Sequence, residues 1–147
     1  MTALTDFAAL VPGDHGLCVV STTRADGSVQ SSVVNAGVLD HPVTGRPAIG
    51  FVVRDGARKL DNLRERPRAT IVIRADWQWA SAEGPAELAG PRDELTGFAP
   101  DALPGLLRAI FQAAGGEHDD WATYDRVMAE ERRTAVLLTP DRVYSNP

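Results

Sequence analysis

Three apolar, β-branched runs follow one another in the first 53 residues and are separated only by short turn signals. They cover residues 16–23, 28–39 and 48–53, with Gly37 a candidate bulge in the second. Asp26-Gly27 separates the first two runs, and glycine accepts the positive φ of a hairpin turn at little steric cost. Short strands joined by hairpin turns favour an antiparallel barrel or sandwich over a sheet built from β-α-β units.

The remaining chain adds further strands and a few helices. Strands are predicted at 69–75, 78–89, 134–139 and 142–144, the second of them interrupted at Gly84-Pro85. Helices are predicted at 3–11, 57–65, 101–114 and 119–132, with Asp119 or Asp120 as the N-cap of the last. With 147 residues, the chain is expected to form one domain, 1–147, that is mainly β with appended helices.

Composition narrows the class of protein. The chain is 44% apolar and 24% charged, as in ordinary soluble globular proteins. The single cysteine, Cys18, cannot form an internal disulfide or a four-ligand zinc site, which favours a reducing compartment. No apolar run approaches the roughly 18 residues of a membrane span, and the first residues lack the basic start of a signal peptide. We therefore expect a cytoplasmic protein with no membrane partner.

The basic residues are unevenly distributed. The net charge is −5, but residues 54–74 hold seven of the 15 basic and three of the 20 acidic residues, a local net of +4. The other 126 residues carry a net of −9, which argues against a nucleic-acid partner. Fourteen of the 15 basic residues are arginine, so Lys59 is the only lysine.

Several catalytic motifs are missing from the sequence. It contains no G-x-G-x-x-G, no P-loop, no G-x-S-x-G and no H-E-x-x-H. The three histidines are far apart, and the acidic run around His118 is better explained by the start of a helix than by a metal site. Cys18 lies in an apolar strand, where a buried, inert thiol is expected. No metal site and no catalytic residue is predicted.

The predicted helix at 57–65 begins with unfavourable charges. A helix amino end carries about half a positive charge, so cations in the first turn are disfavoured. Arg58 and Lys59 occupy that turn, and Arg54 precedes it. Free amides, the helix dipole and three cations together suit a phosphate, and the alternative is a solvated helix face.

Two other patterns suit a flat ligand. Gln30 and Ser32 alternate along one predicted strand and point to one face, while Ser31 and Val33 point to the other. Such a polar row faces either a heteroaromatic ring or solvent. Trp77 and Trp79 also alternate, so they share a face. That face would lie in the core, at a dimer contact, or in the wall of a site for a planar ligand.

Four sequence patterns, taken together, resemble those of a known family. They are a D-G hairpin, R-x(3)-RK-x(2)-NL-x(3)-PRA from Arg54, W-x(4)-AEG from Trp77, and GEHDDW-x(2)-Y-x(2)-VMAEERR-x-AVLLTP-x-RVY from Gly116. Together they resemble the pyridoxamine-phosphate-oxidase-like split β-barrel proteins. More narrowly, they are similar to group B of the flavin/deazaflavin oxidoreductases, which use coenzyme F420.

The resemblance implies a fold and a site. The fold is an FMN-binding-like split barrel, an antiparallel Greek-key barrel of about six strands. The protein is expected to be a homodimer with cofactor sites at the interface. Arg54, Arg58 and Lys59 would bind the phosphate, with Asn62 supporting the same turn, although Ala57 stands where relatives have an arginine. Gln30, Ser32 and Val33 would lie beside the ring, as would the backbone around Val52 and Val53, and Trp77 would close the site from the partner subunit.

The implied function is an F420-dependent oxidoreductase. It would transfer hydride from reduced deazaflavin to an activated double bond of a small organic substrate. This agrees with a sequence that shows no nucleophile, metal site or acid–base pair, since the cofactor carries the chemistry. Two alternatives remain: an FMN-binding flavoprotein of pyridoxamine-phosphate-oxidase type, and a non-catalytic F420-binding protein.

Overall fold

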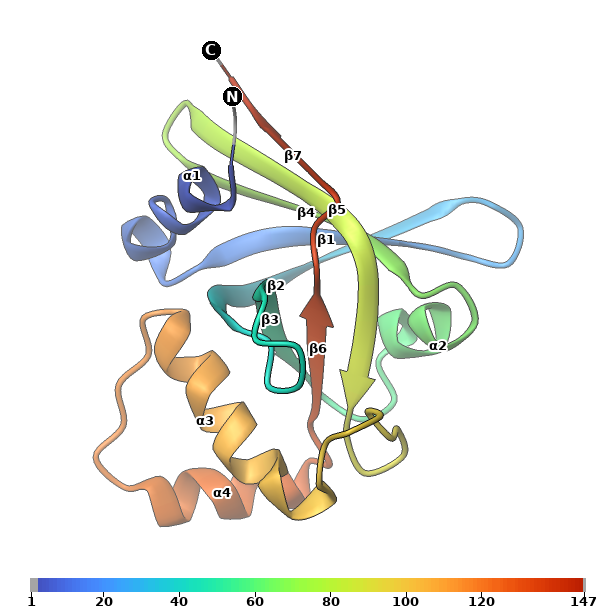
Figure 1. Cartoon of the computed structure of the whole chain (residues 1–147), viewed down its shortest axis with the longest axis vertical. Coiled ribbons are helices and arrows are strands. Elements are labelled where there is room, and N and C mark those ends of the chain that lie inside the picture. Colours follow the sequence, from blue (N-terminus) through green and yellow to red (C-terminus); the bar gives the residue numbers. More distant parts are fainter. Residues whose placement is uncertain (1–2, 147) are drawn as a thin grey trace.

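A computed structural model describes residues 3–146 (Figure 1). The strands are β1 (Leu17–Thr23), β2 (Val29–Asp40), β3 (Pro47–Val53), β4 (Arg68–Ala75), β5 (Gln78–Ala89), β6 (Thr134–Leu138) and β7 (Arg142–Ser145). The helices are α1 (Leu4–Ala8), α2 (Arg58–Glu65), α3 (Leu103–Ala113) and α4 (Trp121–Glu130), with short 3₁₀ turns η1 (Val11–Asp14) and η2 (Pro100–Ala102). Every predicted element is present. The predicted helix at 3–11 is shorter, because a 3₁₀ turn containing Pro12 follows α1.

The strands form a closed antiparallel barrel. The order is β4-β1-β2-β3-β6-β5, and pairing between β5 and β4 closes the ring. Because β4 returns to lie beside β1, the first four strands form a Greek key. The predicted barrel of six strands is confirmed, and β7 is an added strand that pairs with β5 outside the ring.

Strand β2 changes partner halfway along its length. Its first half pairs with β1, from Val29 to Asn35, and its second half pairs with β3, from Ala36 to Asp40. The last two residues of β3, Val52 and Val53, pair only with β6. The barrel wall is therefore split between the start of β2 and the end of β3.

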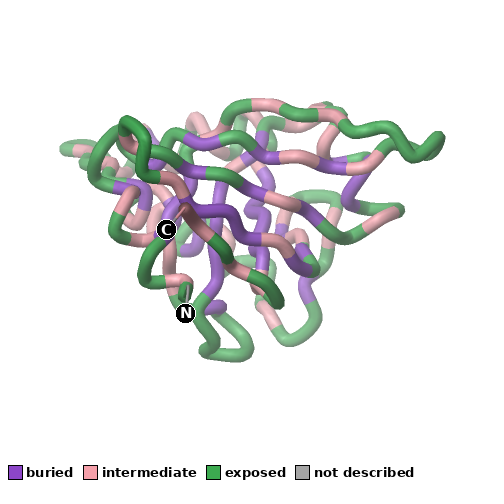
Figure 2. Tube along the Cα trace, turned by 90° about the horizontal axis from the view of Figure 1, so that it is seen from above, coloured by how far each residue is buried: buried purple, intermediate pink, exposed green. Residues whose placement is uncertain are grey.

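Alternation along the strands builds the core, as Figure 2 shows in the change between buried and exposed positions. On β1 the buried side chains are Cys18, Val20 and Thr22, and they point into the barrel. A second apolar cluster lies where α3 and α4 cover β3 and β6, around Leu107, Ile110 and Leu137.

Two glycines allow α3 to lie close to the barrel. A Cβ on Gly37 would lie 2.3 Å from the backbone of Ala113, and a Cβ on Gly50 would lie 2.9 Å from Ile110. Gly37 and Gly50 are paired across β2 and β3. The bulge predicted at Gly37 is therefore wrong: the residue is in regular register, and it is small because a helix crosses over it.

The predicted interruption of β5 at Gly84-Pro85 is also wrong, because the strand continues through both residues. Up to Pro85 it pairs with β4, and from Ala86 it pairs with β6. A Cβ on Gly84 would lie 2.3 Å from the carbonyl oxygen of Thr139, so glycine is required where the chain passes this close. Gly84-Pro85 marks a change of partner within one strand.

None of the helices in the described part of the chain, residues 3–146, is long and apolar enough to cross a bilayer.

A buried histidine holds the turn between β2 and β3. His41 is 2% exposed, and its Nδ1 accepts hydrogen bonds from the backbone amides of Val43 (3.1 Å) and Thr44 (3.2 Å). With Nδ1 accepting, the ring proton lies on Nε2, which donates to Glu87 Oε1 at 2.9 Å. One neutral imidazole therefore ties the turn to β5.

Replacing this histidine should destabilise the fold. We expect His41→Ala to lower the free energy of unfolding by about 2–3 kcal/mol, because three hydrogen bonds are lost and a cavity is left. His41→Asn should cost less, since the asparagine oxygen can still accept from the amide two residues later. Urea unfolding followed by circular dichroism measures both. The control is Glu87→Gln, which keeps an acceptor for Nε2; a loss as large as that of His41→Ala would contradict this account.

Candidate phosphate and ring site at the split of the barrel

Helix α2 follows the end of β3 and lies beside the projecting β1–β2 hairpin (Figure 1). Leu60 and Leu63 are fully buried in the barrel core, which fixes the face that the helix turns inward. Arg58 and Lys59 occupy its first turn, as predicted. Its N-cap is Ala57, which offers no side-chain hydrogen bond to the free amides.

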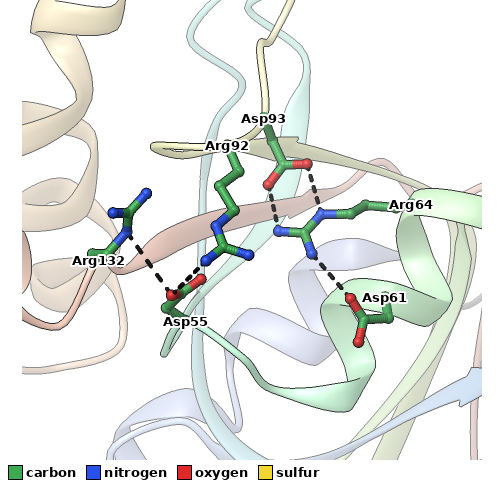
Figure 3. A network of polar contacts seen from close by, with 6 residues as sticks. All are labelled: Asp55, Asp61, Arg64, Arg92, Asp93 and Arg132. Carbon is green, nitrogen blue, oxygen red and sulfur yellow. Dashed lines mark hydrogen bonds and ion pairs between the residues drawn. The ribbon is translucent and has the colours of Figure 1, made fainter.

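The cations of segment 54–74 differ in their pairing. Arg64 is held by Asp93, at 2.9 Å to each carboxylate oxygen, and by Asp61 (Figure 3). Three more cations of this segment form ion pairs: Arg54 with Glu131, Arg66 with Glu65, and Arg68 with Asp141. Within residues 3–146, no ion pair is formed by Arg58 or Lys59. The two cations at the uncapped helix end are therefore free to bind an anion.

Lys59 is half-buried, and this burial lowers the pKa of its ammonium group from the ordinary 10.5. Desolvation disfavours the charged form, and an anionic ligand beside the group would restore it.

Three side chains, those of Asn62, Thr22 and Gln30, form a hydrogen-bonded group between α2 and strands β1 and β2. Asn62 is 6% exposed, and its Nδ2 donates to Thr22 Oγ1 at 3.0 Å and to Gln30 Oε1 at 3.5 Å. Thr22 Oγ1 also donates to Gln30 Oε1, at 3.3 Å. Asn62 was expected to support the same turn as the phosphate ligands; in the structure its side chain joins α2 to β1 and β2. Sequence reasoning missed Thr22, although it lies directly opposite Gln30 in the antiparallel register.

Ser32 follows Gln30 along β2. Gln30 and Ser32 are both half-buried and alternate with the exposed Ser31 and Val33, as the sequence pattern predicts. The Oγ atom of Ser32 is buried and has no hydrogen-bond partner in the described chain. An unpaired buried hydroxyl is unfavourable, so this atom is suited to hydrogen bonding with a ligand.

The side chains of Val33, Val52 and Val53 do not share one surface, although only the backbone was expected to lie beside the ring at Val52 and Val53. Val33 is 60% exposed on the outer face of β2, opposite to the face of Gln30 and Ser32. Val53 is 3% exposed in the barrel core, whereas the half-buried Val52 packs against the second cluster, under α3. Side chains of Val33 and Gln30 therefore cannot contact the same face of one ring within this chain.

Trp77 is the most exposed large apolar side chain among the described residues, at 90%. It lies in the turn between β4 and β5, after Asp76 with its φ of +54°. Trp79, on β5, is half-buried, with its ring edge-on to Tyr144 at 6.1 Å. Trp77 is thus almost fully exposed and Trp79 partly covered, and both line one open pocket beside the end of β4.

The described residues do not favour a reactive thiol or a metal site. The pKa of Cys18 is raised to about 12 by burial, so its thiol stays protonated and unreactive. Over residues 3–146, no three histidine, cysteine or acidic side chains come together as a metal site. The split of the barrel therefore combines an uncapped helix end that carries two cations with the neutral hydrogen-bonding groups of Gln30, Ser32 and Asn62. That combination can bind a phosphate and the polar edge of a planar ring.

Comparison with known proteins shows the fold. No family model matches the chain. Among solved structures, a pyridoxamine 5′-phosphate oxidase-related, FMN-binding protein from Nostoc punctiforme matches with a TM-score of 0.63 at 13% identity, over 97% of this chain and 79% of that one. An F420 reductase matches with a TM-score of 0.60 at 13% identity, over 92% and 94% of the two chains.

A heme-binding protein from Mycobacterium smegmatis is also similar, with a TM-score of 0.60 at 21% identity over 99% of this chain. This chain spans 55% of the length of that protein. The barrel order, the appended helices and these likenesses agree, and they show that the chain has the split β-barrel fold of the pyridoxamine 5′-phosphate oxidase-like proteins.

Proposed function

We propose that this protein is an F420-dependent oxidoreductase, which transfers hydride from reduced deazaflavin to an activated double bond of a small organic substrate. The observation that carries the proposal is the pair of unpaired cations, Arg58 and Lys59, at the uncapped end of α2. They lie in the first turn of the helix that carries Asn62, whose amide reaches Gln30 in the split of the barrel. A solved F420 reductase with the same fold supports it.

In this proposal the protein binds and orients the cofactor, and the cofactor supplies the hydride. Arg58 and Lys59 hold the phosphate, with the free amides of α2 contributing hydrogen bonds. Gln30, Ser32 and Asn62 offer hydrogen bonds to the edge of the ring. The buried thiol of Cys18 takes no part. Holding the ring with one face open to substrate is the work left to the protein.

A homodimer is part of the proposal. Val33, Val19 and Val72 form one row across β2, β1 and β4 in the antiparallel registers, and all three are exposed, at 60%, 42% and 38%. Contiguous exposed apolar surface of this kind is typical of protein interfaces. A second copy covering this face would bury the row and would give Trp77 and Val33 a place at the partner's site.

FMN is the alternative cofactor, because it also has a phosphate at the end of a side chain on a tricyclic ring and because an FMN-binding protein shares the fold. A non-catalytic F420-binding protein is the other alternative.

A side-by-side titration distinguishes the cofactors. We expect purified protein to quench the fluorescence of F420 on binding, and to bind FMN more weakly. Adding reduced F420 with activated enones should then give enzyme-dependent cofactor oxidation. Tighter binding of FMN would overturn the choice of cofactor, and tight F420 binding without oxidation across a broad substrate panel would favour the non-catalytic alternative.

Lys59 should contribute strongly to cofactor binding. We expect Lys59→Ala to weaken F420 binding by at least ~1.5 kcal/mol, about tenfold in Kd, because a charged hydrogen bond to the phosphate is lost. The fold should be unaffected, as judged by circular dichroism. Arg46→Ala removes an exposed cation from the distant β2–β3 turn and serves as the matched control. Unchanged affinity in Lys59→Ala would mean that the phosphate binds elsewhere.

The lowered pKa of Lys59 predicts a pH dependence. A lysine whose pKa lies below 10.5 loses its charge as the pH rises through that lowered value. The affinity of the protein for the phosphate should therefore begin to fall at a lower pH than it would with a fully exposed lysine at this position. Lys59→Arg stays charged and should resist this fall. The measurement is the ratio of the two proteins' F420 affinities from pH 7 to pH 10, in which titration of the ligand cancels. A constant ratio would show that Lys59 does not contact the anion.

The proposed interface can be tested by placing a charge in the middle of the valine row. We expect Val19→Lys to convert a dimer to a monomer in analytical ultracentrifugation, because a buried unpaired ammonium is costly. Val43→Lys, at another exposed valine outside the row, should leave the dimer intact. A wild-type monomer, or a dimer that both variants preserve, would contradict the proposed face.

A further inference from the structure

Arg54, one of the three predicted phosphate ligands, has its guanidinium against a carboxylate of the same chain. Its Nη2 donates to Oε2 of Glu131, which follows the last residue of α4. The backbone keeps the two segments together, since the amide of Asp55 donates to the carbonyl oxygen of Glu131 at 3.4 Å. The contact thus joins the end of β3 to the turn between α4 and β6.

Glu131 does not depend on Arg54 for charge compensation. Its other oxygen, Oε1, accepts from Arg133 Nε at 2.9 Å and lies 2.8 Å from Arg133 Nη2. The pKa of Glu131 is held below its usual value, first by the hydrogen bond from Arg54 and then by that from Arg133. The carboxylate is therefore ionised, and it would keep one guanidinium partner if Arg54 turned to another anion.

Arg54 is also more exposed to solvent than Glu131 and Arg133. The Arg54 side chain is 65% exposed, whereas the Glu131 and Arg133 side chains are 25% and 26% exposed. The half-buried pair is the more fixed, and the exposed guanidinium is the part that can move. A phosphate at the amino end of α2 would then find Arg54 engaged and a negative charge beside it.

We infer that Glu131 competes with the cofactor phosphate for Arg54 and so sets the affinity of the site for anions. This inference rests on the proposed function, because it takes the phosphate to bind at Arg54, Arg58 and Lys59. Glu131 is a residue that tunes affinity and not a catalytic residue. Its charge acts in two ways: it retains the Arg54 guanidinium, and it repels the incoming phosphate.

A double-mutant cycle tests the competition. F420 affinity is measured by fluorescence quenching for the wild type, Glu131→Gln, Arg54→Gln and the double variant. We expect Glu131→Gln to tighten binding by about fivefold, mainly because the Arg54 guanidinium is released to the phosphate and partly because a like charge beside the phosphate is removed. In the Arg54→Gln background the same change should give less than about twofold, because the two residues are directly coupled.

A matched control and a second variant of Glu131 test whether the effect is specific to this carboxylate. Glu130→Gln neutralises the neighbouring carboxylate of α4, which lies 3.8 Å from Arg126, and should leave affinity unchanged. Glu131→Asp shortens the side chain by one methylene, and we expect a smaller gain in affinity than for Glu131→Gln. Circular dichroism and thermal unfolding show whether each variant is folded, so a misfolded Glu131→Gln leaves Glu131→Asp to decide.

The outcomes separate this inference from the proposed function. If the wild type binds F420 and Lys59→Ala weakens binding, but folded Glu131→Gln binds equally or less tightly, the competition is wrong while the site stands. A weaker Glu131→Gln would mean that the carboxylate orders Arg54 for the phosphate. If Arg54→Gln does not change affinity, Arg54 is not a ligand and the inference fails. If neither the wild type nor Glu131→Gln binds F420 or FMN, both the inference and the proposed function fail.

Discussion

The candidate site depends on one strand that serves two neighbours. Strand β2 pairs with β1 up to Asn35 and with β3 from Ala36, so the barrel wall separates at the start of β2. An open strand edge would normally need a partner. Here α2 lies beside it and bonds to it through the Asn62 amide, which meets Gln30 and Thr22 at the split. The same amide joins the helix that begins with Arg58 and Lys59 to the polar row of β2.

Packing and electrostatics oppose one another at α2. Burial of Leu60 and Leu63 fixes the helix, yet its amino end has an alanine N-cap and cations in the first turn. Each of these features is mildly destabilising in a helix. The rest of segment 54–74 shows the opposite, since most of its arginines have a carboxylate partner. Unfavourable local charge that neighbouring residues leave uncompensated is typical of binding sites, where a ligand completes the interactions.

Long-range ion pairs distinguish residues that look alike in sequence. Arg54, Arg58 and Arg64 lie within 11 residues, yet Arg54 meets Glu131 and Arg64 meets Asp93, whereas Arg58 meets no carboxylate in the described chain. Figure 3 shows Arg64 bound by its two aspartates, beside a second group in which Asp55 contacts Arg92 and Arg132. Helix-end preferences group Arg54 with Arg58 as phosphate ligands and set Arg64 apart, and only the fold shows that, among the described residues, Arg54 is paired while Arg58 is not.

The sequence by itself determined an antiparallel barrel or sandwich, the position of nearly every strand and helix, and the anomalous charge at Arg58 and Lys59. These follow from alternation, turn residues and helix-end preferences, which are local properties of the chain. It could not reveal that Gly37 underlies α3, or that Asn62 and Glu131 have partners 40 and 77 residues away, Thr22 and Arg54. Those features depend on contacts between segments distant in sequence. Such contacts exist only once the barrel has closed and α2, α3 and α4 have packed against it.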